Sequence, residues 1–227
     1  MTWILVAEDD AFSRRYLEAT LSAAGWQVEA HADGASAWEA FEVGKRPYSV
    51  VVTDVRMPSL SGLELIRRVR DGDPDIAILA VSGLDSDESI VDGLEAGADD
   101  YLTKPVGAAV LVAKVKAALR RAEPSPDAVV FAADDVELDM AARTVRKGSR
   151  VVALSPTELA LLTFMFRNRG RIVAPAQILA SVWGPAYETE NEMLRVTVLR
   201  LRRKSEDNPS NPHLLRTHVG MGYSLGL

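Results

Sequence analysis

The 227-residue sequence contains no cysteine, and this absence removes several kinds of site at once. A disulfide framework, a thiolate zinc site and a thiol nucleophile are all excluded. The N-terminal segment Met1–Ala7 lacks a basic start, and no apolar run approaches the length that crosses a membrane. We therefore expect no signal peptide, no membrane span and a cytoplasmic protein.

Acidic and basic residues are unevenly distributed along the chain. Residues 1–121 hold 20 Asp and Glu against 13 Lys and Arg, a balance of −7, whereas residues 140–227 hold 6 against 13, a balance of +7. Between them, the polar stretch Ala122–Asp127 contains two prolines, which is typical of a linker. The sequence predicts a domain at 1–121, a linker at 122–128 and a domain at 129–227, of which only the second meets nucleic acid. An unevenly charged solvated surface is the plainer explanation.

Strand and helix patterns alternate five times in the first domain. The apolar runs that indicate strands are Trp3–Ala7, Gln27–Ala30, Ser49–Thr53, Ile76–Val81 and Asp100–Thr103. Helical patterns lie between them, and a last helix covers about residues 109–121. Five such units predict an α/β fold with a doubly wound, five-stranded parallel sheet.

Acids, a hydroxyl and a lysine close four of these runs. The residues are Glu8, Asp9, Asp10, Asp54, Ser82 and Lys104. The carboxyl ends of parallel strands share one edge of a sheet, where such folds bind ligands. Crowded carboxylates repel one another unless a cation lies between them, and Mg²⁺ prefers oxygen ligands. A lysine and a hydroxyl can hold phosphoryl oxygens. The pattern predicts a phosphoryl-accepting aspartate with a metal.

Three motifs closely resemble the receiver domain of two-component response regulators: Ile4–Asp10, Val52–Gly62 and Gly93–Pro105. The resemblance implies a flavodoxin-like fold in which Asp54 accepts a phosphoryl group from a histidine kinase. It implies Mg²⁺ bound directly by Asp9 and Asp54, through water by Glu8, and by the backbone carbonyl of Arg56.

The same resemblance assigns four further roles around the phosphoacceptor. Lys104 neutralises a phosphoryl oxygen, and Ser82 donates a hydrogen bond to another and moves toward it after transfer. Tyr101 is the aromatic switch residue that turns inward when that hydroxyl moves. Gly83 leaves room for the phosphodonor or water. A tyrosine in a strand is otherwise most often a packing residue.

Two enzyme classes also use related sites. A haloacid-dehalogenase-type phosphotransferase needs a second aspartate two residues after the first, and here that residue is Arg56. A flavodoxin-type cofactor domain needs a phosphate-binding loop after its first strand, and here the three acids Glu8–Asp10 would repel phosphate. We therefore expect a protein that accepts a phosphoryl group on its own aspartate and is not a turnover enzyme.

The second domain begins with short strand patterns, which predict a small antiparallel sheet. They are Val136–Leu138, Thr144–Arg146 and Val151–Leu154. A capping box at Ser155–Glu158 then opens a helix. A second helix covers about Pro175–Val182, and another capping-box pattern at Thr189–Glu192 opens a third.

The third helix has an apolar face made by Leu194, Val198 and Leu201. We expect its opposite, exposed face to carry the DNA-binding residues, with Arg200 on a base edge and the flanking arginines on phosphates. These candidates are Arg195, Thr197, Arg200, Arg202, Arg203 and Lys204. A solvated basic helix is the plainer alternative.

Residues 129–227 resemble the winged-helix effector domain of OmpR/PhoB-class response regulators. The motifs that carry the resemblance are Leu154–Glu158, Val182–Gly184, Val196–Lys204 and Gly220–Tyr223. It implies an α+β winged helix-turn-helix domain and a transcription factor that binds promoter direct repeats in double-stranded DNA. A homodimer formed on activation and a contact between the loop at 183–189 and RNA polymerase follow from the same resemblance.

The sequence departs from this family at several positions. Val219 replaces the arginine that the wing usually offers to the minor groove, and Ala174 replaces a serine cap. Asp92 and Val110 occupy the positions of an ion pair on the usual dimer face, and Lys114 replaces an arginine there. The loss of the ion pair at Asp92 and Val110 predicts a weak dimer, in which Lys114 keeps a weaker contact.

A regulator of the same fold that is switched without phosphate, by constitutive dimerisation or by another partner, is the main rival hypothesis. The complete set of Asp9, Asp54, Ser82 and Lys104 argues against it.

Overall fold

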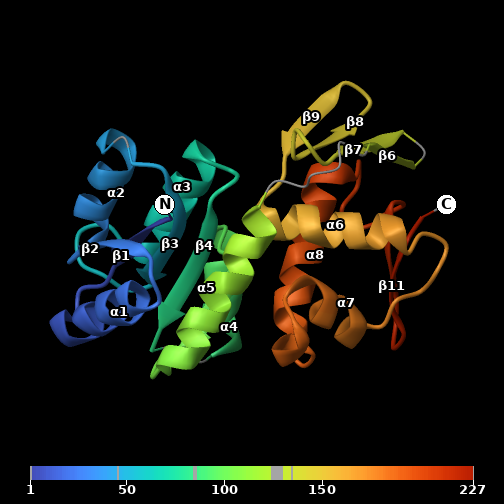
Figure 1. Ribbon diagram of the computed structural model, residues 1–227. Helices are drawn as coiled ribbons and strands as arrows, with labels where there is room; N and C mark the ends of the chain where they lie inside the picture. The colour runs from blue at the N-terminus through green and yellow to red at the C-terminus, as the bar shows by residue number, and fades with distance from the viewer. Residues whose placement is uncertain (1, 45, 84–85, 124–129, 134, 227) are drawn as a thin grey trace. The chain divides into compact units, whose positions relative to one another are not determined.

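The computed structural model describes residues 2–44, 46–83, 86–123, 130–133 and 135–226 (Figure 1). The chain divides into two compact units, Met1–Ala122 and Glu123–Leu227, and each is described by itself.

The first unit alternates strands and helices. Their order is β1 (Trp3–Ala7), α1 (Ala11–Ala23), β2 (Gln27–His31), α2 (Gly34–Val43), β3 (Tyr48–Asp54), α3 (Gly62–Gly72), β4 (Ala77–Ser82), α4 (Asp87–Ala96), β5 (Asp100–Thr103) and α5 (Ala108–Ala122). The strands form one parallel sheet in the order β2-β1-β3-β4-β5. The predicted doubly wound, five-stranded sheet is confirmed.

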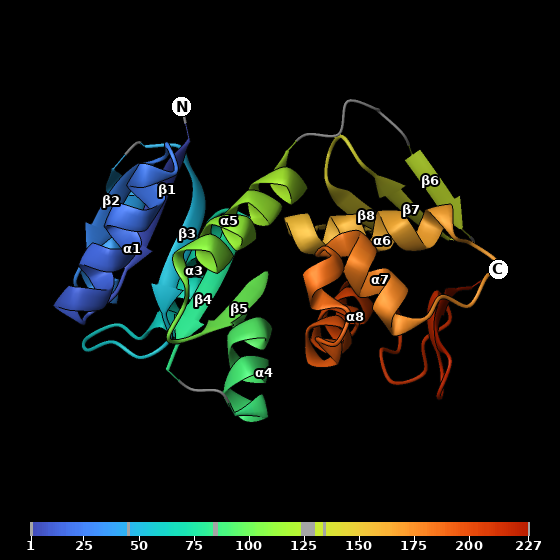
Figure 2. The same cartoon turned by 60° about the horizontal axis from the view of Figure 1, so that its bottom comes forward.

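Two helical layers cover this sheet (Figures 1 and 2). Helix α1 contacts α5 in one layer, and α3 contacts α2 and α4 in the other. Because both faces are covered, the central strands carry continuous apolar runs, and Val50, Val51 and Val52 are fully buried. The apolar residues therefore fix the sheet, and the polar residues that follow each strand meet at its carboxyl edge.

The last helix of the first unit runs one residue past the predicted domain end. Ala122, which we assigned to the linker, belongs to α5. The remaining predicted linker positions other than Glu123 lie outside the described residues.

The second unit combines two small antiparallel sheets with a group of helices. Its elements are β6 (Val130–Ala133), β7 (Val136–Asp139), β8 (Thr144–Lys147), β9 (Arg150–Ala153), α6 (Pro156–Arg167), α7 (Pro175–Val182), the 3-10 turn η1 (Pro185–Tyr187), α8 (Asn191–Ser205), β10 (Leu215–His218) and β11 (Gly222–Leu225). Strands β6 to β9 form a four-stranded sheet, and β10 and β11 form a separate hairpin (Figures 1 and 2). The predicted winged-helix architecture is confirmed.

One of the two expected capping boxes forms. Glu158 N donates to Ser155 Oγ at 3.4 Å, and Ser155 N donates to Glu158 Oε2 at 2.8 Å, so α6 begins as predicted. The box predicted at Thr189–Glu192 is wrong, because the N-cap of α8 is Glu190 and no side chain caps it. Glu190 N donates to Tyr187 O of the turn η1 at 2.9 Å, and the N-cap lies one residue later than the predicted Thr189, so α8 begins at Asn191.

Candidate functional site

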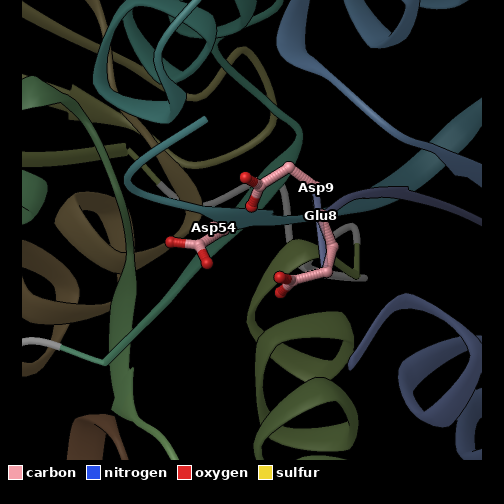
Figure 3. Close-up of side chains that lie close together, drawn as sticks. All are labelled: Glu8, Asp9 and Asp54. Carbon is pink, nitrogen blue, oxygen red and sulfur yellow. The ribbon is translucent and has the colours of Figure 1, made fainter. Parts of the chain in front are cut away.

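Three carboxylates meet at the carboxyl edge of the parallel sheet (Figure 3). The sheet order places β3 beside β1, so Asp54 at the end of β3 faces the two acids that follow β1. One ligand oxygen each from Glu8, Asp9 and Asp54 lies within 4.8 Å of the others. Glu8 and Asp54 are buried, whereas Asp9 is exposed and leaves the group open to solvent. This oxygen set fits a hard divalent cation such as Mg²⁺.

Lys104, which follows β5, reaches into the same group. Its Nζ lies 2.7 Å from Glu8 Oε2 and also contacts Asp54 Oδ2. Burial alone would lower the pKa of Lys104, but its bonds to the two carboxylates outweigh burial and raise that pKa. For Glu8, burial dominates and raises the pKa, while Lys104 offsets part of the shift. The ammonium group therefore stays charged beside Asp54.

Asp10 does not join this group. Its side chain accepts a hydrogen bond from Ser13 N at 2.7 Å and caps α1. The three consecutive acids thus divide into two that face Asp54 and one that starts a helix. Sequence reasoning missed Arg14, whose Nη1 donates to the carbonyl oxygens of Glu8 at 2.8 Å and of Asp9 at 3.0 Å. Arg14 holds the backbone that carries both acids, and only its position in the first turns of α1 hinted at this.

The loop after β3 is tightly constrained by its backbone. Arg56 N donates to Asp54 Oδ1 at 3.0 Å, which orients the carboxylate. A Cβ atom at Gly62 would lie 1.7 Å from Asp54 O, so any side chain there would displace the backbone of the phosphoacceptor candidate. Gly62 had been noted only as part of a loop motif, and its close approach to Asp54 carries no sequence signal by itself.

Ser82 and Tyr101 lie on neighbouring strands, where Tyr101 pairs with Ala80, two residues before Ser82. Ser82 ends β4, Tyr101 belongs to β5, and both are buried. Burial raises the pKa of the Tyr101 hydroxyl, and a side-chain hydrogen bond with Ser82 partly opposes that shift. The ring packs on Gly93 of α4, because a Cβ atom built there would lie 2.9 Å from Tyr101 Cδ2. Gly83 is exposed, and a Cβ there would meet nothing within 4 Å.

In the second unit, the side of α8 that we expected to be exposed faces inward. Thr197 is 4% exposed and Arg200 is 9% exposed, so their predicted placement on the exposed face is wrong. Thr197 Oγ1 donates to Met193 O at 2.8 Å, within the helix. The apolar face made by Leu194, Val198 and Leu201 is buried as predicted.

The reason for this inward face is the buried carboxylate of Glu158 on α6. Arg200 Nε lies 3.1 Å from Glu158 Oε1, and Lys204 Nζ lies 2.6 Å from Glu158 Oε2. Lys204 also donates to Ala153 O at 2.9 Å. Burial works to raise the pKa of Glu158, but the two cations and the Ser155 amide hold it below its ordinary value. A buried carboxylate requires such partners, so it draws the two basic side chains of α8 inward.

Arg195 and Arg203 are exposed, in contrast to Arg200. Arg195 Nη2 makes an ion pair of 2.6 Å with Glu192 Oε2, one turn earlier in α8. Arg202 is partly buried, and its guanidinium donates to the β10 strand of the hairpin. At the tip of this hairpin, Val219 is 93% exposed. The exposed basic surface of α8 therefore contains fewer of the predicted residues, chiefly Arg195 and Arg203.

Of the positions expected on a dimer face, Lys114 makes an ion pair within its own chain. Asp92 and Val110 are exposed, but Lys114 Nζ bonds to Asp100 Oδ1 at 3.0 Å within the same chain.

Comparisons with known proteins agree with this architecture over both units. The family model of the response regulator receiver domain matches residues 4–116, and that of the C-terminal domain of transcriptional regulatory proteins matches residues 148–225. The structure of DrrB, an OmpR/PhoB homologue from Thermotoga maritima, matches with a TM-score of 0.53 at 29% identity, covering 100% of this chain and 99% of that one. The transcriptional regulatory protein KdpE of Mycobacterium tuberculosis is 39% identical over 225 residues, which cover 98% of each chain.

The chain belongs to the OmpR/PhoB class of response regulators. It is a DNA-binding transcriptional regulator of a two-component system. Another similar protein is the response regulator MprA of a Mycobacterium species, which is 41% identical over 98% of this chain and 96% of its own. A mutant of RitR shares the fold, with a TM-score of 0.78 at 21% identity over 99% of each chain. No helix among the described residues is both long and apolar enough to span a membrane.

Proposed function

We propose that Asp54 of this response regulator is the residue that accepts the phosphoryl group from the histidine of a sensor kinase. The P–N bond to the kinase breaks, and a P–O bond to an Asp54 carboxylate oxygen forms. The observation that carries the proposal is the meeting of Glu8, Asp9 and Asp54 beside Lys104 at one sheet edge. In this reaction the protein accepts a group on its own side chain and turns over no separate substrate.

The carboxylate set fits Mg²⁺, with Asp9 and Asp54 as direct ligands, Glu8 through water, and the Arg56 carbonyl as a further ligand. Bound there, the metal supplies positive charge that balances the carboxylates and the transferring phosphoryl group. Arg14 and the Arg56 amide hold the acids in place.

After transfer, Lys104 binds a phosphoryl oxygen in place of a carboxylate oxygen. It can do so because its ammonium group is charged and already contacts Asp54. The Ser82 hydroxyl donates to a second oxygen, and Tyr101 follows that hydroxyl as the switch residue. Tyr101 lies inward on Gly93, which lets it report on the position of Ser82.

We expect Gly93→Ala to uncouple this switch. The added methyl group overlaps the ring of Tyr101, and overpacking of this kind typically costs about 1–3 kcal/mol, so the phosphorylation-dependent gain in DNA affinity should fall at least about fivefold. Alanine favours the α4 helix more than glycine does, so helix weakening cannot explain a loss. Fluorescence anisotropy measures the gain, and Gly107→Ala is the control because a Cβ there meets nothing within 4 Å. An undiminished gain in Gly93→Ala argues against the inward switch.

For DNA, we propose that the exposed side of α8 binds the major groove, with Arg195 and Arg203 on the backbone phosphates. Both guanidinium groups are exposed, whereas Arg200 and Lys204 hold α8 to α6 through Glu158. We further propose that two copies bind promoter direct repeats as a weak homodimer, and that the loop at 183–189 meets RNA polymerase. DNA binding and the contact with RNA polymerase both take place in the cytoplasm.

Phosphorylation should raise DNA affinity if the receiver controls the effector. Coupling between two sites is typically about 1–3 kcal/mol, which is a 5- to 150-fold change in affinity. We expect a change in this range when the protein is treated with acetyl phosphate and Mg²⁺ and titrated onto a duplex selected from random DNA. Asp54→Asn should show no change on the same treatment. Equal affinity of treated and untreated wild-type protein would favour the rival regulator that works without phosphate.

A further inference from the structure

Arg202 joins the α8 helix to the β10 strand at two points. Its Nε donates to Leu215 O at 2.9 Å, and its Nη2 donates to Thr217 Oγ1 at 2.7 Å. Both acceptors belong to β10, and both donors belong to one rigid planar group. Burial lowers the pKa of Arg202, which agrees with a side chain directed into the angle between helix and hairpin.

Other contacts hold the hairpin at its base and at the level of Thr217. Glu206 accepts the backbone N–H groups of Leu214 and Leu215, each at 2.9 Å, where β10 begins. Val173 and Tyr223 of β11 exchange backbone hydrogen bonds of 2.8 and 3.0 Å, and Tyr223 pairs with Thr217, so this contact ties the hairpin to the segment before α7 rather than to α8. The bond from Arg202 to Thr217 reaches farther along β10 than Glu206 does, two residues before the tip at Val219.

We propose that Arg202 is a positioning residue, which fixes the hairpin relative to α8 so that both elements meet the same stretch of DNA. The inference rests on the proposed function, in which α8 binds DNA. It differs from the role expected from the sequence, where Arg202 and Arg203 were both phosphate contacts. The exposed Arg203, the next residue in α8, keeps that role.

The two roles predict different salt dependences. A cationic side chain that contacts phosphate releases a counterion, so its removal lowers the slope of log K against log salt by about 1. A positioning residue lowers affinity without changing that slope. The measurement uses the full-length phosphorylated protein and a duplex selected from random DNA by the wild type, titrated by fluorescence anisotropy at several salt concentrations. Arg202→Ala should keep the wild-type slope, and the matched variant Arg203→Ala should lower it by about 1.

Footprinting on the same duplex separates the hairpin from the helix. In Arg202→Ala we expect protection of the sugars by the hairpin to fade, while protection of guanine N7 by α8 persists. Thr217→Val removes the acceptor without changing charge and should give the same pattern. The double variant should be no weaker than Arg202→Ala, because the bond to Thr217 is already lost in Arg202→Ala. Arg202→Lys keeps the charge but loses the planar fork, so it should also lose hairpin protection.

Two results would overturn the proposal. One is a slope lowered by about 1 in Arg202→Ala with the hairpin footprint intact, which would make Arg202 a phosphate contact. The other is a wild-type footprint in Thr217→Val, which would mean that the hydrogen bond between Arg202 and Thr217 does not position the hairpin on DNA. A wild-type protein that protects no guanine N7 would instead refute the proposed placement of α8 in the major groove, which is a different failure.

Discussion

Acetyl phosphate and Mg²⁺ should add one phosphoryl group to this response regulator, and Asp54→Asn should abolish the addition. Asp54 lies among the carboxylates of the sheet edge and contacts Lys104, and the amide of asparagine cannot act as the nucleophile. Chelation of the metal should also abolish the adduct, because unbalanced carboxylates repel an anionic donor. Intact-protein mass spectrometry measures the adduct directly.

The neighbouring acids supply a matched pair of controls. Asp9→Asn removes a proposed metal ligand, so it should raise the Mg²⁺ concentration needed for half-maximal labelling. Asp10→Asn changes the adjacent residue in the same way, but asparagine caps a helix as well as aspartate does, so labelling should match the wild type. If Asp10→Asn and Asp9→Asn behave alike, the assignment of the two acids is wrong.

Glu158→Gln should strongly destabilise the second unit. Glu158 is fully buried and neutralises Arg200 and Lys204, and removal of one partner from a buried ion pair typically costs about 3–5 kcal/mol. Hydrogen exchange of full-length protein, followed by mass spectrometry of peptides from α6 and α8, reports the loss locally. The exposed pair offers the control, since Glu192→Gln should cost no more than about 1 kcal/mol.

Two further measurements test the buried ion pair: the pH dependence of stability and the substitution of Arg200. The pKa of Glu158 is lower in the folded protein than its ordinary value of 4.5, so its stabilising effect is present at neutral pH. That effect is lost as the pH falls below 4.5 through the folded-state value. Arg200→Met should destabilise the same peptides, and the double variant should lose less than the sum of the two single losses. Additive losses would contradict a shared buried network.

The difference between Arg200 and Arg203 shows where sequence reasoning stopped. Apolar spacing located α8 and its buried Leu194, Val198 and Leu201, because burial of apolar surface dominates such a pattern. Helical spacing alone then placed Arg200 and Lys204 on the opposite side, with the other arginines on its flanks. It could not show that Glu158, far away in the sequence and recognised only as a helix cap, would be buried and would draw Arg200 inward.

The site in the receiver domain was predicted more fully from the sequence than the DNA-binding surface of α8. Strands of a parallel sheet end at one edge, so the residues after each apolar run had to meet there, as Glu8, Asp54 and Lys104 do. Contacts that depend on backbone detail were missed. Arg14 holds two carbonyl groups, and Gly62 lies against the Asp54 carbonyl, but neither interaction leaves a periodic pattern in the sequence.

The ion pairs of Lys104 give the phosphoacceptor site a simple charge balance. Glu8, Asp9 and Asp54 carry three formal negative charges and Lys104 carries one positive charge, which leaves −2. One divalent cation therefore brings the site to zero, whereas a monovalent cation leaves it negative. If Asp54 accepts the phosphoryl group as proposed, its change from a carboxylate to a dianionic acyl phosphate lowers the charge of the metal-bound site from zero to −1. The phosphorylated site would then differ from the metal-bound resting site by a single unit of negative charge.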